Sequence, residues 1–177
     1  MNSFSLSVLV CVSFAACGGG DAAPAAAKAP APAIAALSLK SEPANALGVV
    51  AAKQKGPADA VAITGRLFTI TPGFAQWKLM DLALPYCGEK NKEDKCETPW
   101  DYCCDIPHIP ANSLLVEARG ADGKPIATPS LGDLRLLDRV TVTGKLERDE
   151  HGNFVLVATG WHRVDRPTLP AYVKLPQ

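Results

Sequence analysis

The chain has 177 residues, and its 18 basic and 18 acidic side chains give a formal net charge of zero at pH 7. This balance leaves no excess of lysine and arginine for phosphate contacts, so nucleic acid is an unlikely partner. No internal repeat is visible, and no apolar run beyond the N-terminal one suits a transmembrane helix.

The N-terminus predicts export. The apolar run Phe4–Ala16 is short for a permanent membrane span and ends in two alanines, which is typical of a signal peptide over residues 1–16. Cys17 follows directly, and Phe14-Ala15-Ala16-Cys17 resembles the lipobox of bacterial lipoproteins. That resemblance implies cleavage before Cys17 and a diacylglyceryl group on its sulfur. The alternative is an ordinary signal peptide with an incidental cysteine.

Residues 17–38 are rich in glycine, alanine and proline and contain few bulky apolar side chains. Such a segment cannot bury enough surface to fold and behaves as a semi-extended spacer. We therefore expect a lipid-anchored linker that holds a folded domain off a membrane of the bacterial cell envelope, facing the periplasm or the exterior. The sequence does not distinguish the inner from the outer membrane.

The first element expected in the folded part is a helix over residues 44–55. Ser41 can cap its free N–H groups, Pro43 suits the first turn, and Gly56 suits the position after its end.

Five strands are expected after this helix, because β-branched and alternating residues recur between turn signals. Their expected ranges are 59–71, 74–84, 113–119, 138–147 and 154–163. Residues 130–136 leave room for a short helix after the third strand. Asp81 is either a buried partner of Arg66 or an exposed residue at a bulge.

This order predicts a mainly β fold: a five-stranded Greek-key barrel of the OB type over residues 39–164, with a C-terminal tail over 165–177. Residues 62–67 (AITGRL) and 138–146 (DRVTVTGKL) resemble the V-x-V-x-G-x-L strands of bacterial OB-fold domains. The preceding helix is similar to that of the periplasmic bacterial OB-fold (BOF) family. A cysteine-rich insert, residues 85–112, separates the second and third strands and departs from the BOF pattern.

Within the insert, Cys96–Cys104 (CETPWDYCC) resembles a C-x-T-P-W-D-Y-C-C motif in functionally uncharacterised bacterial envelope lipoproteins with nucleic-acid-type OB domains. The resemblance implies the barrel and the location, but no ligand.

Four cysteines lie in the insert: Cys87, Cys96, Cys103 and Cys104. Thiols oxidise outside the cytoplasm, so two structural disulfides are expected. A bond between the neighbours Cys103 and Cys104 would close a strained ring. Cys87 with Cys103 and Cys96 with Cys104, or Cys87 with Cys104 and Cys96 with Cys103, remain as pairings.

Two alternatives use the same residues. Thiolates favour zinc or copper, and His108 lies close by in the sequence, although no C-x-x-C pair is present. The vicinal pair Cys103-Cys104 could also act as a redox switch. The expectation is nevertheless that the cysteines are structural and that the protein holds no cofactor.

OB barrels bind ligands across the second and third strands and the adjoining loops. The insert joins those strands, so Trp100, Asp101 and Tyr102 are the expected ligand-binding residues. The alternative is that the rings of Trp100 and Tyr102 only cover the disulfides and the open end of the barrel. No hydrolase, zinc-protease or nucleotide-binding motif occurs. The sequence therefore predicts a non-catalytic envelope binding module whose partner is an unidentified envelope protein or small ligand.

Overall fold

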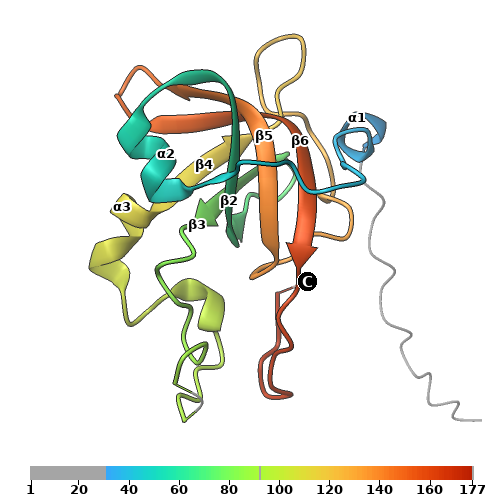
Figure 1. The fold of residues 1–177 in the computed structure, drawn as a ribbon. Coiled ribbons are helices and arrows are strands. Elements are labelled where there is room, and N and C mark those ends of the chain that lie inside the picture. Colours follow the sequence, from blue (N-terminus) through green and yellow to red (C-terminus); the bar gives the residue numbers. More distant parts are fainter. Residues whose placement is uncertain (1–30, 92, 177) are drawn as a thin grey trace, which may run out of the picture.

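The computed structural model describes residues 31–91 and 93–176 (Figure 1). The expected signal peptide, the lipid site Cys17 and most of the linker therefore lie outside the described residues. In the described part, no helix has the length and apolar character needed to cross a membrane.

The five longer strands follow the expected order along the chain, whereas the described end of the expected spacer, residues 31–38, contains a short helix that buries Ile34 in the core. The elements are α1 (Pro32–Ala35), β1 (Leu47–Gly48), α2 (Val49–Lys55), β2 (Ala58–Ile70), β3 (Gln76–Met80), the 3₁₀ turns η1 (Pro99–Asp101) and η2 (Ile106–His108), α3 (Ile109–Asn112), β4 (Ser113–Glu117), β5 (Arg139–Arg148) and β6 (Phe154–Asp165). The five longer strands overlap the five expected ranges, although β3 and β4 are shorter than expected.

The five longer strands close a barrel. The strand β2 pairs antiparallel with both β3 and β5, and the circuit is completed through β4 and β6. The β4–β6 pair is parallel, whereas β3–β4 and β5–β6 are antiparallel. This order agrees with an OB-type barrel, so the predicted mainly β barrel is confirmed.

One glycine permits the close pairing of β5 and β6. A Cβ atom at Gly144 would lie 2.1 Å from the carbonyl oxygen of Val157. The register of the two strands shifts between Thr143 and Gly144, which marks an irregularity in the ladder at this point. Only a residue without a side chain fits there.

Alternate side chains of the strands fill the barrel. Trp77 and Trp161 are buried in this core with their rings edge to face, 5.5 Å between centroids. Apolar residues from all five strands surround them: Ile63, Leu67, Leu79, Leu114, Val116, Val140, Val142 and Leu156. This continuous core fixes the strand ends from which the candidate site is built.

The expected helix over 44–55 begins later than predicted, at Val49. Asn45 has a φ of 56°, and Leu47–Gly48 pair with β2 instead of coiling. The helix is capped from a distant segment, because the carboxylate of Asp81 accepts the N–H of Val50 at 2.8 Å. Ser41 is therefore not the cap. The predicted end is correct, since Gly56 has a φ of 91° and donates its N–H to the carbonyl of Ala52.

The short helix expected after the third strand is absent from residues 118–138. Gly132 and Leu137 have positive φ values of 76° and 68°, which breaks any helical run. Leu131, Leu134 and Leu137 are nevertheless buried, and the first two belong to the hydrophobic core.

Candidate functional site

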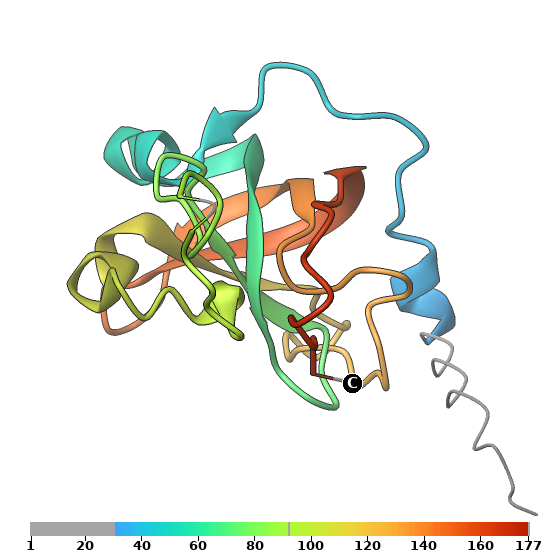
Figure 2. The ribbon, with the colours of Figure 1, turned by 90° about the horizontal axis from the view of Figure 1, so that it is seen from below.

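Two segments extend beyond the same end of the barrel (Figure 1). Residues 82–108 leave β3 and return to β4 through α3, and residues 166–176 follow β6. We call these two segments together the rim. Figure 2 looks onto this end of the molecule. The hydroxyl of Tyr172 in the tail donates to the carbonyl oxygen of Asp94 in the insert at 3.4 Å, so the two segments are in contact.

An ion pair ties the start of the insert to the barrel. The guanidinium of Arg66, on β2, contacts the carboxylate of Glu89 and lies 5.1 Å from the ring centroid of Tyr86. Arg66 therefore pairs with Glu89 and not with Asp81. The buried carboxylate of Asp81 instead accepts backbone N–H groups, including that of Ala83 at 2.9 Å.

Tyr102 anchors the end of the insert. Its side chain is fully buried, and its ring meets that of Phe68 edge to face at 5.4 Å. Its φ of 51° is a left-handed conformation that turns the chain directly before Cys103. Burial raises the pKa of its phenol. Because none of the ring is exposed, Tyr102 offers no stacking platform at the surface in this conformation.

The other two expected ligand-binding residues point to different places. Trp100 is half-buried and lines an apolar hollow of about 480 Å³ together with Phe68 and Leu134. The carboxylate of Asp101 accepts the hydroxyl of Thr98 at 2.6 Å and the N–H of Cys103 at 2.9 Å, so it stabilises the turn. Trp100, Asp101 and Tyr102 thus do not form one binding surface.

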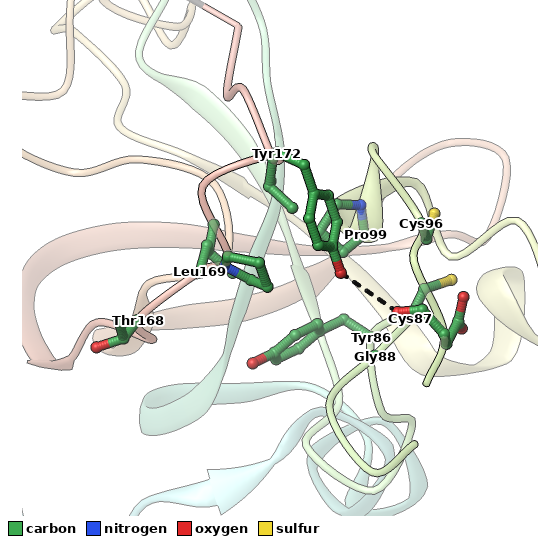
Figure 3. A pocket seen from close by; sticks show the side chains of 11 residues that line it. Tyr86, Cys87, Gly88, Cys96, Pro99, Thr168, Leu169 and Tyr172 are labelled. Carbon is green, nitrogen blue, oxygen red and sulfur yellow. Dashed lines mark hydrogen bonds between the residues drawn. The ribbon is translucent and has the colours of Figure 1, made fainter. Parts of the chain in front are cut away.

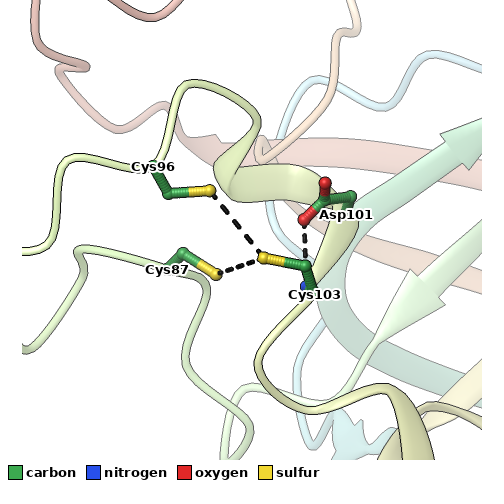
Figure 4. A group of neighbouring side chains, drawn as sticks. All are labelled: Cys87, Cys96, Asp101 and Cys103. Carbon is green, nitrogen blue, oxygen red and sulfur yellow. Dashed lines mark hydrogen bonds between the residues drawn. The ribbon is translucent and has the colours of Figure 1, made fainter.

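The four cysteines of the insert meet at the rim, and all four are free thiols in the structure. The sulfur of Cys103 lies 3.8 Å from that of Cys87, 4.0 Å from that of Cys96 and 4.0 Å from that of Cys104. The sulfurs of Cys87 and Cys104 are also 3.8 Å apart. Figure 4 shows Cys87, Cys96 and Cys103 turned toward one another, beside Asp101.

Oxygen ligands lie within reach of these sulfurs. A carboxylate oxygen of Asp101 lies within 4.8 Å of the sulfurs of Cys87, Cys96 and Cys103. A carboxylate oxygen of Asp94 likewise lies within 4.8 Å of the sulfurs of Cys87 and Cys104. Among the residues that the structure describes, neither group includes His108, which is exposed. The sequence pattern placed His108 near this site, but the fold does not.

The expected disulfides are not formed in the structure, and they stay a prediction. The distances nevertheless discriminate between the two pairings left open by the sequence. Cys87 with Cys104 and Cys96 with Cys103 are both close pairs, at 3.8 and 4.0 Å. The other pairing also needs a bond between Cys96 and Cys104. These two sulfurs are not among the four pairs that lie within 4.0 Å of each other. Oxidation would therefore favour the first pairing.

Burial raises the pKa of the Cys87 thiol to about 11. Hydrogen bonding to Cys87 likewise raises the pKa of Cys103, although this residue is exposed. Burial and hydrogen bonding thus both favour the protonated thiols at neutral pH, unless a cation replaces their protons.

A pocket of about 330 Å³ opens between the insert and the tail (Figure 3). Its wall is formed by Tyr86, Cys87, Cys96, Pro99, Leu169 and Tyr172. The tail's contribution was not predicted, because its proline-rich sequence carries no periodic pattern. Tyr172 is one of the few large apolar residues exposed on the described part of the chain, with 41% of its surface accessible.

A second hollow, of about 500 Å³, lies on the outer face of β3 and β4. Lys78 and Leu115 line it together with Phe154. This is where OB barrels commonly bind ligands. Lys53 also borders it, but its ammonium group already donates to the carbonyls of Pro110 and Ala111 at 3.0 and 2.9 Å.

Comparison with known proteins adds no identity to this geometry: no protein-family model matches the chain, and no curated protein matches it significantly.

Proposed function

We propose that the protein is a non-catalytic binding module of the bacterial cell envelope, tethered by lipid on Cys17, which recognises its partner through the rim. The observation that supports this proposal is the pocket between insert and tail, where segments far apart in the sequence meet on one end of the barrel. A closed barrel supplies a rigid base for such loops, and loops on a rigid scaffold commonly carry binding function.

The lining indicates the chemistry of the partner. Tyr86, Tyr172, Pro99 and Leu169 give the pocket aromatic and apolar surface, and Asp94 adds an acidic group at the edge. Such a surface suits an uncharged, partly apolar segment of an envelope protein or a small ligand of that kind. It offers no cluster of basic groups for a phosphate backbone, which agrees with the zero net charge of the chain.

Photo-crosslinking in the living bacterium tests this placement. A photoreactive amino acid in place of Tyr172 should give a discrete adduct, because the ring is partly exposed at the pocket. The matched control is the same substitution at Glu150, in the exposed turn between β5 and β6, far from the rim. Adducts from Glu150 or Lys78 but not from Tyr172 would move the binding surface away from the rim.

The tether is tested separately. Cys17→Ser removes the sulfur that would carry the lipid, so labelling with a radioactive fatty acid should mark the wild-type protein and not this variant. A wild-type protein that takes up no label under the same conditions would contradict the lipid anchor.

A further inference from the structure

The sulfur positions at the rim resemble those of a thiolate metal centre. Cys87, Cys103 and Cys104 form a triangle with sides of 3.8, 4.0 and 3.8 Å, and Cys96 lies 4.0 Å from Cys103 on another side. The sulfur of Cys96 is also within 4.8 Å of that of Cys87. Four ligands around a single point make six sulfur–sulfur pairs. Five of these six pairs are therefore close together.

These separations match the size of such a centre. With a zinc–sulfur bond of about 2.3 Å, the sulfurs of a tetrahedral site lie about 3.8 Å apart, and those of a trigonal site about 4.0 Å. A disulfide instead needs sulfurs at about 2.0 Å. Four of the six sulfur pairs thus have the spacing of ligands around an ion, and Cys96 has to approach Cys104 when all four bind.

We propose that Cys87, Cys96, Cys103 and Cys104 together bind one soft closed-shell cation, Zn²⁺ or Cu⁺. Thiolate sulfur selects both of these ions. Each metal–sulfur bond replaces a sulfur–hydrogen bond, the displaced protons pass to solvent, and no electrons are transferred. This inference goes beyond the proposed function, because the rim can bind a partner whether an ion or two disulfides join its cysteines.

The surroundings favour an ion at this position. Cys103 and Cys104 are exposed, so an ion can reach the sulfurs and protons can leave. The carboxylate of Asp101 accepts the N–H of Cys103 at 2.9 Å and fixes the direction of that ligand. Groups that orient a ligand from behind in this way raise metal affinity.

An ion would also supply what the insert lacks. The run from Gly88 to Lys95 is hydrophilic and has no apolar side chains to bury. Its two ends and the turn at Tyr102 would be joined at one point by Cys87, Cys96 and Cys103. Binding free energy of a structural ion is folding free energy for a loop of this kind.

The experiment uses the full chain with Cys11→Ser and Cys17→Ser, so that only the four rim thiols remain, kept reduced and free of oxygen. Zn²⁺ and Cu⁺ are each titrated against a chromophoric chelator, and Co²⁺ serves as an optical probe of the ligands. We expect one equivalent to bind, with sulfur-to-cobalt charge-transfer absorption. Absence of stoichiometric binding, or a cobalt spectrum without thiolate bands, would overturn the proposal.

Variants assign the ligands. Cys87→Ser and Cys103→Ser should each weaken binding by at least 100-fold, about 2.7 kcal/mol. Glu97→Gln, an exposed acidic neighbour in the same insert, should leave it unchanged. Circular dichroism of each variant reports whether the barrel is folded, and the wild-type titration tests the proposal even if a variant unfolds. Unchanged affinity in folded Cys103→Ser would refute the assignment.

The native state is tested on protein purified from the envelope without thiols or chelators. Elemental analysis should find one zinc or copper per chain and identify which. Two disulfides and no ion would overturn the proposal, while leaving the crosslinking test of the rim intact.

Discussion

The tail is held to the barrel by one buried ion pair, and Arg166→Met should release it. The guanidinium of Arg166 donates to both carboxylate oxygens of Asp138 at 2.6 Å and to the carbonyl oxygen of Asp133 at 2.5 Å. The side chain of Asp138 has no exposed surface, whereas 26% of that of Arg166 is exposed. Methionine keeps much of the apolar stem but leaves a buried carboxylate without its cation.

The magnitude follows from this burial. Removing one partner of a fully buried pair costs about 3–5 kcal/mol, because the remaining charge is stranded. Water can reach the exposed part of Arg166, so we expect a smaller loss of about 2–3 kcal/mol. For a domain of this size, that loss lowers the midpoint of thermal unfolding by about 6–9 °C.

Urea unfolding measures this loss, with the fluorescence of the buried Trp77 and Trp161 as the signal. The matched control is Arg163→Met, because Arg163 pairs with Asp133, whose side chain is 71% exposed. We expect the control to lose less than about 1 kcal/mol. Equal losses in the two variants would refute the role assigned to the buried pair.

Tyr102→Phe removes a buried hydroxyl that has no hydrogen-bond partner in the described structure, so the free energy of unfolding should stay equal or rise by about 1 kcal/mol; a clear decrease would reveal a missing partner. Gly144→Ala places a Cβ against the carbonyl of Val157 and should cost about 3 kcal/mol or more, and a neutral result would contradict the strand register. Hydrogen bonds to Asn153 and to the backbone lower the pKa of Asp149. Its contribution to stability is therefore present above its unfolded-state pKa and is lost as the pH falls through its folded-state pKa. The free energies of unfolding of Asp149→Asn and wild type should converge in acid, and a constant difference across pH would argue against this. Alkylation of Cys87 in the metal-free protein should accelerate up to about pH 11 and be suppressed by bound Zn²⁺, as peptide mass mapping would show.

The strands could be predicted because their signals are local. Alternation of valine and threonine in β5, and turn residues such as Asp149 and Gly152, identify a hairpin without knowledge of the rest of the chain. The start of α2 could not be predicted in this way, because the carboxylate that caps the helix belongs to Asp81, a residue from another segment. Ser41 fits the local capping pattern, which places the expected start of the helix too early.

The site was predicted only in part, for a similar reason. The spacing of the cysteines singles out the four residues that the fold brings together, but their convergence depends on the left-handed turn at Tyr102 and on the anchoring of the insert by Arg66. Neither is visible in a cysteine pattern. The start of the tail is held by Asp138, a buried residue whose partner Arg166 lies 28 residues further along the chain.

Native mass spectrometry of the protein, extracted from the bacterial envelope in mild detergent, tests most directly whether a lipid-tethered barrel carries a metal-held rim. The predicted mass is that of a chain beginning at a diacylglyceryl-modified Cys17 with one zinc or copper ion, and four alkylatable thiols should appear once the protein is denatured with a chelator. An unlipidated chain, or one with no ion and all four rim cysteines in disulfides, would contradict it.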